Sequence, residues 1–80
     1  MLAENTLKYT VFFEPAAEGG YIAHVPALSG LVTQGETLEE AKSMAQDAIE
    51  GYLSILAEDG EEIPVESEET LVSKIQARVP

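Results

Sequence analysis

The sequence contains no cysteine and no long apolar run. Without cysteine there is no disulfide framework, zinc–thiolate site or thiol nucleophile, so nothing requires an oxidising compartment. No segment approaches the ~20 apolar residues of a membrane-spanning helix. Residues 1–6 lack the basic stretch and apolar run of a secretory signal. These absences predict a cytoplasmic protein.

Basic side chains are also scarce, since four lysine and arginine residues stand against 15 acidic residues, for a net charge of −11. This charge repels phosphate backbones and favours a basic protein partner. It would equally serve only to keep a small domain in solution. Because the basic residues are few and no recognition-helix motif is present, direct binding to nucleic acid is not expected.

The length of 80 residues predicts a single domain over residues 1–80. A domain of this size buries only ~60% of the surface that its unfolded chain exposes. A lone monomer should therefore be marginally stable, and association with other copies is a natural remedy.

Two alternating segments separated by a glycine turn predict a hairpin. The first strand is expected over residues 7–14, with Leu7, Tyr9, Val11 and Phe13 facing a helix. Gly19 and Gly20 can supply the turn. In the second strand, over residues 21–25, either Tyr21, Ala23 and Val25 or Ile22 and His24 face inward, and we prefer the first set. Pro26 then ends the strand, and residues 31–34 form a short third one.

A long amphipathic helix is predicted over residues 38–58. Thr37 and Glu40 have the spacing of a capping box at its start, and Gly60 is the expected C-terminal cap. Gly51 lies inside the helix at a cost of about 1 kcal/mol relative to alanine. A close contact with a neighbouring backbone would explain this glycine. Apolar residues recur at spacings of three and four: Ala41, Ala45, Ala48, Ile49, Tyr52, Leu53 and Leu56.

Residues 58–69 are strongly acidic and are expected to form an exposed connector. Residues 70–79 alternate again and predict a fourth strand. A strand, a helix and another strand form a crossover unit, so the last strand should run parallel to another strand. The predicted class is α+β, in the order β-β-β-α-β, with a mostly antiparallel sheet and one helix on one face.

The ordered string "HVPALSG", "TQGET" and "LEEA" after a glycine hairpin resembles the amino-terminal domain of the HicB family of antitoxins. The resemblance covers Tyr9 to Pro64. It implies a partial ribonuclease-H-like sheet in the order 3-2-1-4. Two departures are that Leu31 stands where many relatives have cysteine, and that the sequence ends at Pro80, where many relatives continue into a DNA-binding domain. No separate DNA-binding domain is therefore expected.

The residues do not predict an enzyme. Two-metal hydrolysis of nucleic acid needs several converging carboxylates, but the middle of the first strand offers Val11 and Phe12. His24 is the only histidine, and the sequence shows no orienting carboxylate or nucleophile for it. Residues 59–62 lack the ordered oxygen spacing of a calcium loop. No catalytic residue, metal or cofactor is expected.

The resemblance implies a HicB-like antitoxin that binds and neutralises a small basic mRNA-cleaving toxin of the HicA type. We expect the toxin to contact acidic residues of the helix and connector: Glu50, Glu58, Glu61 and Glu62. The alternative is a self-associating structural or regulatory module without a toxin partner.

A homo-oligomer is also predicted, most simply a two-fold dimer. Phe12, Ile22 and Val72 are expected on the sheet face opposite the helix, where an apolar cluster usually marks a contact. Lys8, Lys74 and Arg78 would form a positive strip beside them. This strip is either ordinary solvated surface or a contact with an acidic surface such as another copy.

Overall fold

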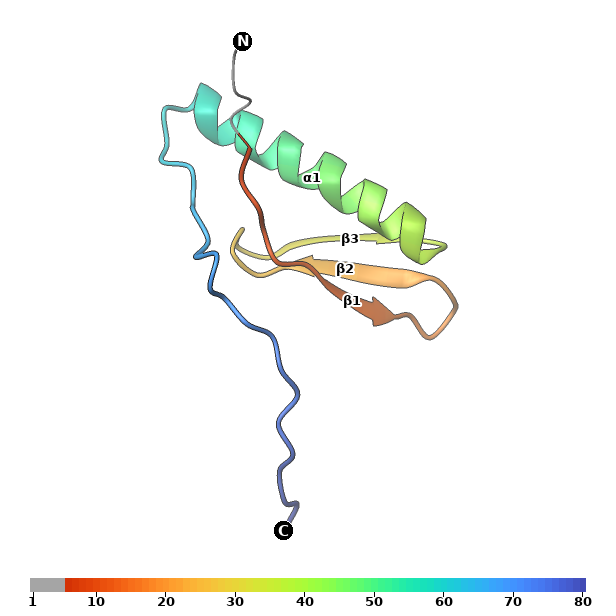
Figure 1. Ribbon diagram of the computed structural model, residues 1–80. Coiled ribbons are helices and arrows are strands. Elements are labelled where there is room, and N and C mark those ends of the chain that lie inside the picture. Colours follow the sequence, from red (N-terminus) through yellow and green to blue (C-terminus); the bar gives the residue numbers. More distant parts are fainter. Residues whose placement is uncertain (1–5) are drawn as a thin grey trace.

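The structure, a computed structural model, describes residues 6–80. Its elements are β1 (Phe12–Pro15), β2 (Tyr21–Val25), β3 (Leu31–Gly35) and α1 (Leu38–Glu58). The strands form one antiparallel sheet in the order β1-β2-β3, and α1 crosses one of its faces (Figure 1). The predicted α+β class, with three antiparallel strands followed by a helix, is confirmed.

The hairpin between β1 and β2 depends on glycine. Gly20 has a φ of +78°, and its carbonyl accepts a hydrogen bond of 2.9 Å from the Ala16 N–H. A Cβ added at Gly20 would lie 2.5 Å from the carbonyl oxygen of Gly35, at the end of β3. Both the left-handed backbone and the close approach therefore exclude other residues here.

The inward face of β2 is the one preferred from the sequence. Ala23 and Val25 are buried, whereas Ile22 and His24 are only partly covered on the other face. The turn after β2 adds Leu28, which is fully buried. Its N–H donates to the Val25 carbonyl at 3.1 Å, so the turn delivers a core side chain as well as reversing the chain.

Capping explains the start of α1. The Glu40 N–H donates to the Thr37 hydroxyl at 3.0 Å, as the capping box predicts. The Glu40 carboxylate accepts from the Glu36 N–H at 2.5 Å. The box is thus displaced by one residue, since the usual acceptor contact would be to the N–H of the cap residue itself.

The end of α1 is a Schellman motif. The Gly60 N–H donates to the Ala57 carbonyl at 3.2 Å, and the Glu61 N–H donates to the Leu56 carbonyl at 2.9 Å. Gly60 has a φ of +72°. The predicted cap at Gly60 is confirmed, and the two bonds satisfy carbonyls that a helix end would otherwise leave unpaired.

Small residues allow α1 to lie close to β3 and β2. Ala41 and Ala45 are buried, and a Cβ added at Gly35 would lie 2.4 Å from the Ala41 backbone nitrogen. The close approach occurs here and not at Gly51, where nothing lies within 4 Å of an added Cβ. The contact predicted for Gly51 is therefore wrong.

The buried core is small. Among residues 6–80, the buried apolar side chains are Ala23, Val25, Leu28, Ala41 and Ala45. Three of these five are alanines, so the apolar area removed from water is modest and the stabilisation it supplies is correspondingly limited. Within the same range, no helix has the length and apolar content needed to cross a membrane.

The predicted fourth strand over residues 70–79 is not formed. Residues 67–80 are all exposed and form an extended tail (Figure 1). The tail leaves the body, which consists of the sheet, α1 and the connector up to Glu66. Val72, Lys74 and Arg78 therefore do not lie on the sheet beside Phe12, and the order 3-2-1-4 is not present within the described chain. Alternation shows that a segment can form a strand, but a strand also needs a neighbour for its backbone hydrogen bonds.

The first strand is also shorter than predicted, starting at Phe12 rather than Leu7. Phe12 pairs with His24, which leaves Val25 as the last β2 residue that could extend the ladder. Beyond it, Pro26 has no N–H to donate. Residues 7–11 therefore run beside the body without sheet pairing.

Candidate partner-binding site

The C-terminal end of α1 concentrates negative charge. Glu58 is its last residue, Asp59 is the C-cap, and Glu61 and Glu62 follow. All four are exposed, and the last turn contains no basic residue. Because the helix dipole is negative at this end, each exposed acidic group here costs roughly 0.3–1 kcal/mol at low salt. A cationic partner would relieve this repulsion.

Three of the four residues predicted to contact a toxin are therefore neighbours in the chain at this end. Glu50 is not with them, because eight residues of helix separate it from Glu58 by about 12 Å along the axis. It is exposed, and its carboxylate accepts a hydrogen bond of 3.4 Å from the Gln46 amide. The four residues are therefore spread along α1 and the connector and do not form one compact cluster.

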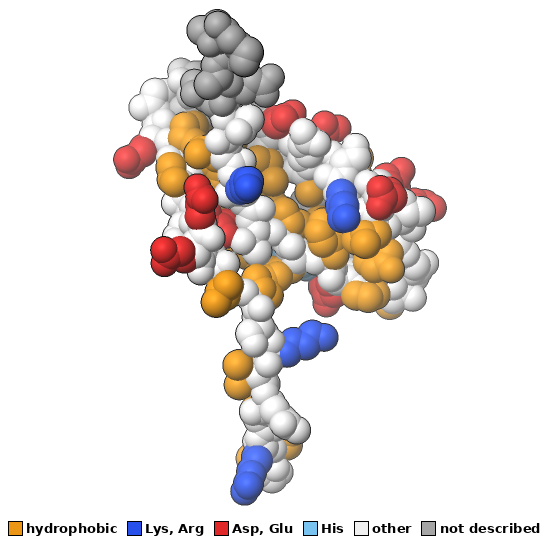
Figure 2. Space-filling view, in the orientation of Figure 1, with side chains coloured by type: hydrophobic (Ala, Val, Ile, Leu, Met, Phe, Trp, Pro, Cys, Tyr) orange, Lys and Arg blue, Asp and Glu red, His pale blue; other side chains and the backbone are white. Residues whose placement is uncertain are grey.

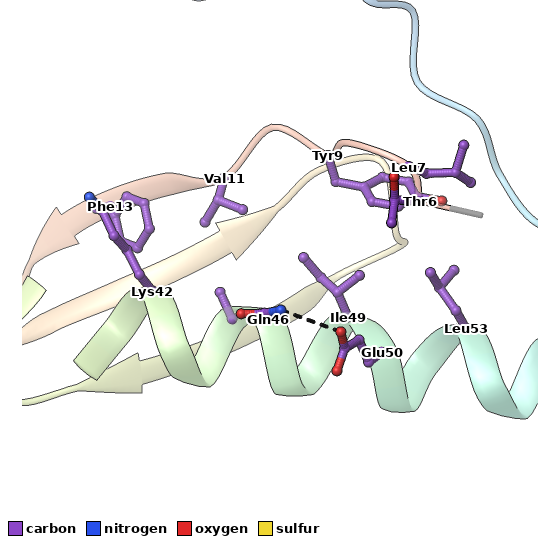
Figure 3. A pocket seen from close by; sticks show the side chains of 11 residues that line it. Thr6, Leu7, Tyr9, Val11, Phe13, Lys42, Gln46, Ile49, Glu50 and Leu53 are labelled. Atoms are coloured by element: carbon purple, nitrogen blue, oxygen red, sulfur yellow. Dashed lines mark hydrogen bonds between the residues drawn. The ribbon is translucent and has the colours of Figure 1, made fainter. Parts of the chain in front are cut away.

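Glu50 also lines an open groove between α1 and the segment leading into β1. The groove has a volume of about 610 Å³. Its apolar lining comes from two sides: Leu7, Tyr9, Val11 and Phe13 on one side, and Ala45, Ile49 and Leu53 on the other. In Figure 3, Ile49 and Leu53 of α1 point toward the side chains of the first set. The first set faces the helix as predicted. In the space-filling view, hydrophobic side chains are visible on this side of the body (Figure 2).

The groove is open because α1 lies over β3 and β2 and leaves the β1 side less covered. Leu7, at one end of the groove, is 47% exposed. A fourth strand beside β1 would have covered this region.

The connector after α1 is tied to the segment before β1. The Tyr9 hydroxyl donates to the Pro64 carbonyl at 2.5 Å, and the Thr10 N–H donates to the Glu66 carboxylate at 2.8 Å. The Thr10 hydroxyl donates to the other oxygen of that carboxylate. These contacts fix the point at which the tail leaves the body.

This tie, the contacts between residues 9–10 and residues 64–66, shifts the pKa values of Tyr9 and Glu66. Hydrogen bonds from the Thr10 hydroxyl and N–H lower the pKa of Glu66. Burial, followed by the nearby Glu66 charge, raises the pKa of Tyr9. The sequence predicted only an exposed connector, because no periodic pattern connects residues 9–10 with residues 64–66.

His24 has a carboxylate partner that the sequence did not indicate. Its Nε2 lies 2.9 Å from Glu14 Oε1 across β1 and β2, on the face opposite α1. The strand register could have revealed this pair, because position 14 faces position 22 and is diagonal to position 24. Among residues 6–80, no three His, Asp or Glu side chains are grouped so that they could hold a metal ion.

The same outer face exposes apolar side chains. Phe12 and Val32 flank His24 in one cross-strand row and are 40% and 52% exposed. Ile22, in the next row, is partly covered. Of the residues predicted for an oligomer contact, Phe12 and Ile22 are therefore on one face, whereas Val72, Lys74 and Arg78 are on the tail.

Comparison with known proteins gives a consistent set of relatives. Residues 9–78 match the model of a family described as the HicB-like antitoxin of bacterial toxin–antitoxin systems. Antitoxin HicB 1 of Photorhabdus laumondii is 42% identical over 76% of this chain and 39% of its own length. Antitoxin HicB of Escherichia coli K12 is 39% identical over 76% of this chain and 44% of its own length.

The chain therefore spans less than half the length of these two antitoxins. A UPF0150 protein of Thermoplasma acidophilum is similar over nearly its whole length, with 38% identity over 81% of this chain and 94% of that protein. The family thus includes relatives of about this size as well as longer ones.

Proposed function

Because the chain belongs to the family of HicB-like antitoxins of bacterial toxin–antitoxin systems, we propose that it binds and neutralises a small basic toxin. We infer a toxin of the HicA type, an mRNA-cleaving protein that acts in the cytoplasm. The observation that carries this proposal is the exposed acidic end of α1, with its connector, in a chain of net charge −11.

This surface suits a basic partner for two reasons. Its charges steer a cationic protein toward it and so raise the association rate. Its charges also repel one another and the negative end of the helix dipole, and a bound cationic surface removes that cost. A toxin covered by this acidic surface would present negative charge to RNA, which would exclude the phosphate backbone from the toxin.

The test has two steps: a search for a reading frame beside the gene that encodes a small basic protein, and a measurement of the association of that protein with the purified chain. Reversing the four predicted residues, in a variant carrying E50K, E58K, E61K and E62K, should slow association and flatten its dependence on salt. Steering acts over roughly 8 Å at physiological ionic strength, so the effect should be local. Stopped-flow fluorescence over a range of salt concentrations measures both quantities.

A matched control separates this surface from net charge alone. E61K with E62K changes the net charge as much as E18K with E36K, but Glu18 and Glu36 lie near the glycine hairpin, at the start of α1. The first pair should slow association much more than the second. Equal effects, or unchanged kinetics in the fourfold variant, would show that the toxin uses another surface.

A self-associating structural or regulatory module without a toxin remains a second candidate. The exposed apolar face around Phe12 and Val32 favours it. The absence of a basic reading frame beside the gene, together with oligomerisation of the chain alone, would support this alternative.

We further propose that the chain has no enzymatic activity. Among residues 6–80, the Glu14–His24 pair is the constellation that could raise a nuclease hypothesis, and we assign it a cross-strand stabilising role. Incubating the purified chain with RNA and Mg²⁺ or Mn²⁺ should give no cleavage. RNA cleavage that disappears in E14Q would overturn this assignment.

A further inference from the structure

Two features of the body and tail have no partner within the described chain. β1 pairs with β2 on one side only, so its other edge is open beside the apolar groove. The tail, residues 67–80, is extended and exposed, with Leu71 at 90% and Ile75 at 83% exposure. An open strand edge and an unpaired alternating segment are complementary, because the backbone N–H and C=O groups of one can pair with those of the other.

The tail cannot fill the groove of its own copy with its apolar residues. Glu66 is held at Thr10. If the chain continued beside β1 from this anchor, Leu71 would reach only Pro15, the last residue of β1, because paired strands advance by similar distances per residue. Glu68 and Glu69 would then lie along β1 beside the groove, and the later apolar residues would pass the end of the sheet.

The turn after Glu66 also directs the tail away. The Glu69 N–H donates to the Ser67 hydroxyl at 3.1 Å, and the Thr70 N–H donates to the Ser67 carbonyl at 3.2 Å. Beyond this turn the tail projects from the body, and its end is far from the sheet (Figure 1). The molecule reaches 53 Å in its longest dimension, against 28 and 27 Å in the others.

We propose that the tail of one copy binds in the groove of a second copy, adds a strand to the open edge of β1, and that the exchange is reciprocal. The face formed by Leu71, Ile75 and Val79 would contact the groove residues of α1. A two-fold exchange pairs the open β1 edge of each copy with the tail of the other copy, so neither tail is left unpaired. It would also supply a fourth strand next to β1, as in the order 3-2-1-4.

Charge favours this pairing. The tail carries Lys74 and Arg78, and all 15 acidic residues precede Thr70. Glu68 and Glu69 stand at the start of the tail, so its basic part is residues 70–80. In Figure 2, basic side chains lie along the projecting part of the tail. With the apolar face turned toward α1, both basic residues lie on the opposite side of the added strand, the side on which Glu14 is exposed. Residues 70–80 of each tail would therefore bring positive charge to the acidic surface of the other copy.

The first test is the mass of the full chain by sedimentation velocity across micromolar concentrations. Wild type should be a dimer, and I75E should raise the dimer dissociation constant by about tenfold or more, because docking would then bury an unpaired charge. Q76E is the matched control, with the same charge change one position away on the opposite face. Because Ile75 does not pack against its own body, the helix content of I75E should be unchanged by circular dichroism.

The second test distinguishes exchange from docking within one copy. The chain has no native cysteine, so introduced thiols are unique. I49C protein is mixed under mild oxidation with L71C, I75C or V79C protein, and at least one mixture should give a disulfide-linked dimer of two different copies. I49C mixed with Q76C should give much less, and each variant alone sets the background.

Cross-linking of no odd-numbered tail position to I49C above that background would overturn the proposal. So would a monomeric wild-type chain, or an equal loss of dimer in I75E and Q76E. A link that forms only when I49C and I75C are in the same chain would show docking within one copy and would equally overturn it. None of these outcomes depends on a toxin, so they are distinct from a failure of the proposed function.

Discussion

Residues 21–25 and residues 71–79 have the same alternating pattern, yet they lie in opposite environments. In β2, Ala23 and Val25 are buried beneath α1, whereas Leu71 and Ile75 in the tail are almost fully exposed. The difference is the neighbour, since β2 has strands on both sides and the tail has none within the described chain. Alternation therefore indicates that a segment needs a partner, and does not say which chain supplies it.

The largest difference between the two regions should appear when the same substitution is made in each. Leu28 is fully buried in the body, so L28A should lower the free energy of unfolding by about 2–5 kcal/mol. This loss should be the same at every protein concentration. L71A should instead cause a smaller loss that grows as the concentration is raised, because its side chain is buried only in the dimer. Urea unfolding at two protein concentrations measures both.

A second substitution tests the close approach that holds α1 on the sheet. A Cβ at Gly35 would meet backbone atoms of Ala41 at 2.4 and 2.8 Å. Because backbone cannot move aside as a side chain can, G35A should destabilise the body by about 1–3 kcal/mol. A thermal unfolding temperature equal to that of wild type would show that α1 can shift without cost.

G51A is the matched control for G35A, and its expected change in stability has the opposite sign. No atom lies within 4 Å of a Cβ added there, and alanine is favoured over glycine in a helix by about 1 kcal/mol. G51A should therefore raise the unfolding temperature. A decrease would indicate that a partner's backbone approaches α1 at this point.

The smallest expected effect concerns the tie between body and tail. The pKa of Glu66 is lowered in the folded chain. The ionised carboxylate therefore contributes to folding stability above the unfolded pKa, and this contribution is lost as the pH falls through the lower pKa of the folded chain. The hydrogen bonds to Thr10 should therefore persist at the ordinary pKa of 4.5 and open only as the pH falls through the lower pKa of the folded chain. Backbone amide shifts of Thr10 during an NMR titration measure this, and E66Q should remove the acid-dependent change.

The body was largely predictable because its signals are local. The capping box at Thr37 and the cap at Gly60 follow from spacing within a few residues. Alternation gave the two faces of β2 but did not decide which of them is buried. Contacts between distant segments were not predictable in this way. The tie from Thr10 to Glu66 and the close approach at Gly35 depend on tertiary placement that no periodicity encodes. The His24–Glu14 pair depends on the register of the hairpin, which the sequence analysis did not assign.

The acidic site was predicted in part for the same reason. Glu58, Glu61 and Glu62 are close in the chain, so their proximity followed from the sequence. The groove was not predicted, because we expected a fourth strand over residues 70–79 to cover this region. The Leu7–Phe13 face was correctly assigned toward α1, but the strand that would cover it is missing from the described chain.

Hydrogen exchange of the full chain tests the central claim that the tail forms a strand only when it pairs with β1 of another copy. The amides of residues 70–79 should exchange rapidly at low protein concentration and become protected as the concentration rises through the dimer transition. The β2 amides should be protected throughout. Rapid exchange of the tail at every concentration, or protection that does not depend on concentration, would contradict the account.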